Sequence, residues 1–127
     1  MNRDTSTFSD TSSPLISSDR VEGTKVFDGS GNSIGTIKRL MIEKTSGQVA
    51  YAVSAFGGFL GMGDQERPIP WDQLTYDTRL GGYRTGLTEA QLREAPISTQ
   101  DDNWTNRDRE RELHDYYGAA YYWEDEE

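Results

Sequence analysis

Alternation of apolar and polar residues is clearest between residues 25 and 55 and predicts three strands. Residues 25–27 form a short candidate strand, and residues 33–43 alternate until three apolar residues at 40–42 interrupt the pattern. Because successive side chains of a strand point to opposite faces, this interruption predicts a bulge or bend. Residues 48–55, rich in Val, Tyr and Ala, form the third predicted strand.

The segments between these strands are rich in turn-forming residues. Residues 28–32 read Asp-Gly-Ser-Gly-Asn, and residues 44–47 end in Gly47, which can adopt a positive φ. Both segments predict hairpins, and two adjacent hairpins make a meander.

The second half of the chain predicts a weaker set of strands. Two prolines in residues 67–71 each remove a ladder donor, which favours an edge strand or an irregular crossing. Residues 72–74 are predicted as one helical turn. Residues 75–77 and 83–85 are predicted as a last hairpin around two glycines.

Two helices are predicted after the strands. Thr88 is expected to start a short helix, with Gln91 at the capping-box position, and Pro96 is expected to end it. A second helix is predicted over residues 106–117, followed by Gly118 at the position of a C-cap. Because large aromatic residues are costly to leave in water, we expect this helix and the aromatic segment after it to pack on the barrel of the same chain or of a dimer mate.

Composition sets the domain organisation. The chain has 127 residues, of which only 33% are hydrophobic, which suits one core with tails. We expect a disordered leader at 1–14, a folded domain at 15–98, and an acidic, aromatic-rich helical tail at 99–127. The last four residues, all acidic, are expected to stay solvated.

Charge narrows the classes of partner. The net charge is -9, and residues 101–127 hold ten acidic residues and three arginines, which leaves -2 for the rest. This balance argues against nucleic acid as the main ligand. The chain has no cysteine, which fits a cytoplasmic protein, and no apolar run approaches the ~20 residues that a transmembrane segment needs.

Two motifs resemble chemical sites, and neither fits its chemistry. Residues 31–35 match the GxSxG pattern of serine hydrolases, but Ser33 enters a strand and the only histidine is His114 in the acidic tail. Residues 28–32 place oxygen-bearing side chains as a calcium loop does, but Arg39 stands where the bidentate glutamate is needed. We therefore predict no enzyme activity, no metal and no cofactor.

The order of motifs resembles a known family. The elements GNSIGTIKRLMI and SGQVAYAV are followed by PIPWDQLTYD and LTEAQLREAP. Together they resemble the PRC-barrel family, named for the cytoplasmic domain of the photosynthetic reaction centre H subunit. The resemblance implies a mainly β fold, a small, partly open antiparallel β-barrel, here with one or two short C-terminal helices. Similar proteins include reaction-centre subunits, domains of ribosome maturation factors and small bacterial proteins without an assigned role.

The residues and the resemblance together favour a non-enzymatic protein-interaction or assembly module that forms a homodimer and binds an unidentified protein partner. The alternative is a small-molecule or ion sensor with the same barrel. The glycine-rich segment 56–64 carries large apolar residues, which either pack into the core of the barrel or form an interface with a partner. The candidate interaction residues are Phe59, Leu60, Met62, Trp71, Trp104, Tyr116, Tyr117, Tyr121, Tyr122 and Trp123.

Overall fold

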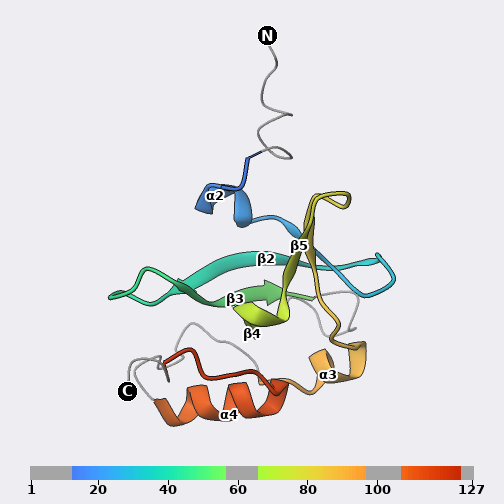
Figure 1. Cartoon of the computed structure of the whole chain (residues 1–127). Helices are drawn as coiled ribbons and strands as arrows, with labels where there is room; N and C mark the ends of the chain where they lie inside the picture. The colour runs from blue at the N-terminus through green and yellow to red at the C-terminus, as the bar shows by residue number, and fades with distance from the viewer. Residues whose placement is uncertain (1–12, 57–65, 97–106, 124–127) are drawn as a thin grey trace.

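The computed structural model describes residues 13–56, 66–96 and 107–123. Within these ranges, six strands form one sheet in the order β4-β3-β2-β1-β6-β5 (Figure 1). Their bounds are β1 Lys25–Phe27, β2 Ser33–Ile42, β3 Val49–Ala55, β4 Glu66–Pro70, β5 Thr75–Asp77 and β6 Gly82–Arg84. The sheet is not closed, which confirms the predicted mainly β, partly open barrel.

One pairing differs from the prediction of an antiparallel sheet. The pairs β1–β2, β2–β3, β3–β4 and β5–β6 are antiparallel, but β1 and β6 run parallel. No short turn joins β1 to β6, so no hairpin imposes an antiparallel arrangement on them. The sheet is therefore mixed.

Strand β2 bends the sheet. Its first part pairs with β1 and its remainder pairs with β3, with the change at Thr36, which contacts Lys25 on one side and Ala55 on the other. The β2–β3 register shifts between Ile37 and Arg39 and again between Met41 and Ile42. Irregularities of this kind bend a strand and increase its twist, so the predicted bulge is confirmed.

The prolines of β4 lie at an edge of the sheet, as predicted. β4 pairs only with β3 within the described residues, and its end leads into the 3-10 helix η1, Trp71–Gln73. The next strand, β5, lies at the opposite end of the strand order. A single 3-10 turn thus connects the two ends of the sheet and curls it toward a barrel.

In the described part of the chain, three short α-helices accompany the sheet. α3, Glu89–Arg93, begins with the predicted capping box between Thr88 and Gln91, and α4 spans Arg107–Tyr117. A further helix, α2, Ser18–Val21, is not among the predicted elements. Helices α3 and α4 lie together on one side of the sheet, and α2 lies on the other (Figure 1).

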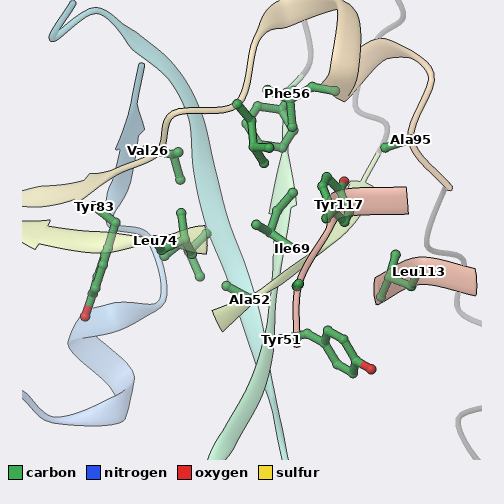
Figure 2. Packing of buried hydrophobic residues seen from close by; sticks show 14 of the residues in the cluster. Val26, Tyr51, Ala52, Phe56, Ile69, Leu74, Tyr83, Ala95, Leu113 and Tyr117 are labelled. Carbon is green, nitrogen blue, oxygen red and sulfur yellow. The ribbon is translucent and has the colours of Figure 1, made fainter. Parts of the chain in front are cut away.

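The core extends from the sheet into these helices. Figure 2 shows Val26, Phe56 and Ile69 of the sheet region in one cluster with Leu113 and Tyr117 of α4. All five side chains are buried. Because α4 contributes to the same core, the described part of the tail is a structural component of the folded chain.

A buried arginine attaches α3 to the sheet. The Arg67 guanidinium, from β4, donates hydrogen bonds to the carbonyl oxygens of Leu92 and Arg93 at 2.7 and 3.1 Å. These carbonyls belong to the last turn of α3, where helix carbonyls lack partners within the helix. Burial lowers the pKa of Arg67 from its ordinary value. The side chain therefore works as a cap for the C-terminus of α3.

Candidate interaction site

Helix α4 is held against β3 by a group of polar side chains named here the tail cluster: the buried Tyr51, Glu110 and His114 and the half-buried Tyr122. The Tyr51 hydroxyl donates to Glu110 Oε1 at 2.7 Å and lies 2.9 Å from His114 Nε2. The Tyr122 hydroxyl donates to the same Glu110 oxygen at 2.7 Å. The cluster therefore connects the sheet, α4 and the chain after α4.

Burial controls the chemistry of the tail cluster. Tyr51 is 1% exposed and His114 is 2% exposed. Burial, followed by the hydrogen bond to Glu110, raises the pKa of both Tyr51 and Tyr122. His114 Nδ1 lies 2.9 Å from the Ala120 carbonyl oxygen, which only accepts, so this nitrogen carries a hydrogen. Both ring nitrogens of His114 are thus engaged in contacts that position the tail.

The aromatic segment after α4 returns along the helix. The Trp123 ring lies 4.7 Å from the Tyr121 ring, centroid to centroid, and nearly parallel to it. The Arg107 guanidinium lies 4.3 Å from the Trp123 centroid, a distance suited to a cation–π contact. Arg107 Nη1 also lies 3.8 Å from Glu110 Oε2. The first turn of α4 and the end of the described chain therefore hold each other in place.

The structure describes six of the ten candidate interaction residues, and these six differ in burial. Tyr117 and Trp123 are buried within this chain. Trp71, Tyr121 and Tyr122 are half-buried, and Tyr116 is exposed on α4. The other candidates, Phe59, Leu60, Met62 and Trp104, lie outside the described residues.

Three of these candidates meet at one surface feature. Trp71, Tyr121 and Tyr122 line a hollow of about 200 Å³, named here the Trp71 hollow, together with Pro70 and His114. Trp71 comes from η1 and the two tyrosines come from the docked tail, so neither the barrel nor the tail forms this hollow alone. A hollow with aromatic walls and a few polar groups is suited to receive an apolar or aromatic side chain of a partner.

The residues that dock the tail, Tyr51, Glu110 and His114, are not among the sequence candidates. A signal for two of them exists, because Glu110, Leu113, His114 and Tyr117 recur at helical spacing and are all buried. Glu110 and His114 are polar residues in an acidic tail, and such residues usually lie on the solvent-exposed face of a helix. Their helical spacing is therefore easily overlooked as a sign of burial.

The structure also accounts for the motifs at the first hairpin. The Asp28 carboxylate accepts hydrogen bonds from the backbone nitrogens of Ser30 and Asn32, both at 2.9 Å. These bonds lower the pKa of Asp28, with the bond to Asn32 as the main cause. The motif is thus an Asx-type turn. Across the described residues, no group of three or more His, Asp or Glu side chains is placed to hold a metal ion.

Comparison with models of known protein families gives one match. Residues 14–84, more than half of the chain, match the model of the PRC-barrel domain. A solved structure of a Pseudomonas aeruginosa protein described as the 16S ribosomal RNA processing protein RimM is similar, with 23% sequence identity and a TM-score of 0.39. The match covers 62% of this chain and 48% of that chain, so this chain spans about half the length of that protein.

No curated protein matches the chain. None of the helices in the described ranges is long and apolar enough to cross a membrane.

Proposed function

We propose that this chain, which belongs to the PRC-barrel family, is a non-enzymatic protein-interaction module. The observation that carries the proposal is the Trp71 hollow, which has aromatic walls and forms only when the tail is docked. Barrel residues 15–98 serve as the scaffold, and the docked tail within 99–127 supplies one wall of the contact surface. A cytoplasmic location remains a prediction from the lack of cysteine.

The side chains best suited to catalysis support a structural role. The only histidine, His114, is buried and engaged through both ring nitrogens. Ser33 is an exposed residue at the start of β2. A serine nucleophile needs a base within hydrogen-bond reach, and both ring nitrogens of His114 are engaged in contacts that position the tail.

We further propose that the partner at the Trp71 hollow is a second copy of this chain, forming a homodimer. Half-buried rings from two elements present a concave, apolar surface beside the β4 edge. Aromatic residues in such hollows are the usual anchors of protein interfaces. A twofold dimer would place the same hollow of each copy in the contact.

Light scattering behind size exclusion tests the homodimer. The expected mass at micromolar concentration is about twice 14.3 kDa. Tyr121→Ala removes one wall of the hollow and is expected to shift the mass to one chain. Tyr116→Ala removes an exposed ring of the same size from α4 and should leave the dimer intact.

Circular dichroism of each variant separates lost contacts from lost folding. A wild-type chain that elutes as a monomer ends the homodimer proposal and leaves a different protein as the partner. A dimer that Tyr121→Ala leaves unchanged places the interface away from the Trp71 hollow.

A further inference from the structure

A larger cavity, of about 420 Å³, also has Trp71 in its wall. Its volume lies within the ~300–1,000 Å³ range of pockets that hold small molecules. It opens between the start of the described chain and the β5–β6 hairpin, and the side chains that matter are Leu15, Ile16, Trp71, Leu74, Tyr76 and Tyr83. The tail supplies one wall of the Trp71 hollow, but none of its described residues lines this cavity.

One side of the cavity is a continuous wall of aromatic rings. The Trp71 and Tyr83 centroids are 5.3 Å apart with a tilt of 55°, and the Tyr76 and Tyr83 centroids are 5.1 Å apart in an edge-to-face arrangement. Because these rings pack on each other, they leave no space for a cation enclosed by ring faces. A ligand would instead pack against the faces and edges of rings that are tilted to one another.

The opposite side is the segment 13–16, which runs into α2. Leu15 is 82% exposed and Ile16 is 43% exposed, although both line the cavity. These aliphatic side chains therefore leave the apolar space beside them unfilled. Apolar surface left in water is unfavourable, so a molecule that fills the space gains contact with the segment and with the ring wall.

The lining also sets the charge of the ligand. Among the described residues, those around the cavity are all uncharged: Ser13, Pro14, Leu15, Ile16, Trp71, Leu74, Thr75, Tyr76 and Tyr83. A charged molecule would lose its hydration without gaining a partner of opposite charge. Figure 2 shows Tyr83 at the edge of the core cluster with its hydroxyl directed away from Leu74. The phenol and hydroxyl groups of the lining are the polar groups that can orient a ligand.

We propose that this cavity binds a neutral aromatic molecule that packs against the ring wall formed by Trp71, Tyr76 and Tyr83. This binding activity goes beyond the interaction module proposed above and does not depend on it. It gives the chain a separate place for a small molecule, formed by the barrel and the segment 13–16.

The experiment uses N-phenyl-1-naphthylamine, a neutral aromatic probe whose fluorescence rises in an apolar site. We expect saturable binding with one probe per chain. Tyr76→Ala, which removes part of the wall, and Ile16→Glu, which places a carboxylate in the neutral lining, should each weaken binding by about tenfold. Tyr116→Ala and Tyr121→Ala lie outside the cavity and should bind as the wild type does.

Three results would overturn this proposal. The first is a probe signal that does not saturate or that is equal in the two cavity variants and the wild type. The second is displacement of the probe by choline, which would indicate a cation site. The third is a dimer that Ile16→Glu dissociates while no probe binds, because the cavity would then be a protein contact. Since Ile16→Glu and Tyr76→Ala alter different sides, one remains informative if the other fails to fold.

Discussion

Removing the Tyr51 hydroxyl is the sharpest test of how the tail is held. Tyr51→Phe keeps the buried ring and deletes the atom that reaches both Glu110 Oε1 and His114 Nε2. The change leaves a hydrogen-bond position empty on each of two buried groups. Its effect therefore measures the polar part of the contact between α4 and β3.

The expected cost follows from these two losses. A hydrogen bond to a charged group contributes about 1.5–3 kcal/mol, and a buried polar atom left without a partner costs about 1–3 kcal/mol. Glu110 Oε1 keeps its bond from Tyr122, which reduces the loss. We expect the free energy of unfolding to fall by about 2–4 kcal/mol.

Tyr122→Phe is the matched control. It deletes the other phenol hydroxyl on the same Glu110 oxygen, at the same distance of 2.7 Å, from a side chain that is only half-buried. Water can replace part of that bond, so we expect a loss of about 1 kcal/mol.

Urea unfolding followed by circular dichroism gives both values, and amide exchange of α4 shows whether the tail opens before the sheet. A loss below about 0.5 kcal/mol for Tyr51→Phe, or a larger loss for Tyr122→Phe, would refute this account of the tail cluster.

Three further predictions test other parts of the fold. Burial raises the pKa of Tyr51 and Tyr117 above the value in the unfolded chain, so the folded state keeps these two protons at a higher pH than the unfolded state does. The free energy of unfolding should therefore be unaffected by these groups below pH ~10 and fall above it. Tyrosine absorbance at 295 nm should change together with unfolding. Gly35→Ala would place a Cβ 2.5 Å from a core ring and should lower the melting temperature by several degrees, whereas Gly29→Ala, with open space around it, should change it by less than ~1 °C; equal melting temperatures would contradict the close approach. Arg67→Met removes the donors to two carbonyls of α3 and should cost about 2–4 kcal/mol in urea unfolding, and a neutral result would show that water replaces them.

Local sequence signals predicted the parts of the fold that short-range physics determines. The hairpin turns, the proline-bearing edge strand, the capping box at Thr88 and the turn at Gly118 each depend on residues within a few positions of one another. The interrupted alternation of β2 is a signal of the same kind.

The features that the sequence did not predict depend on distant partners or on weak patterns. Helix α2 has four residues, too few for a helical period to be visible. The parallel pair of β1 and β6 joins Val26 to Tyr83, and no turn chemistry specifies a contact between strands so far apart. The burial of Glu110 requires two phenols from other segments, neither of which its own neighbours reveal.

The low hydrophobic content of the chain therefore understates its core. A count of apolar residues leaves out side chains that carry polar atoms. Tyr51, Arg67 and His114 are nevertheless among the largest side chains that are fully buried. Each brings aromatic or aliphatic surface to the core and has its polar atoms directed to a specific partner. Such residues are stable in the core only when their polar partners are in place. The hydrogen bonds that satisfy them therefore also fix the positions of α3 and α4. An acidic, aromatic tail of this kind is consequently docked in one register, and that register creates the Trp71 hollow.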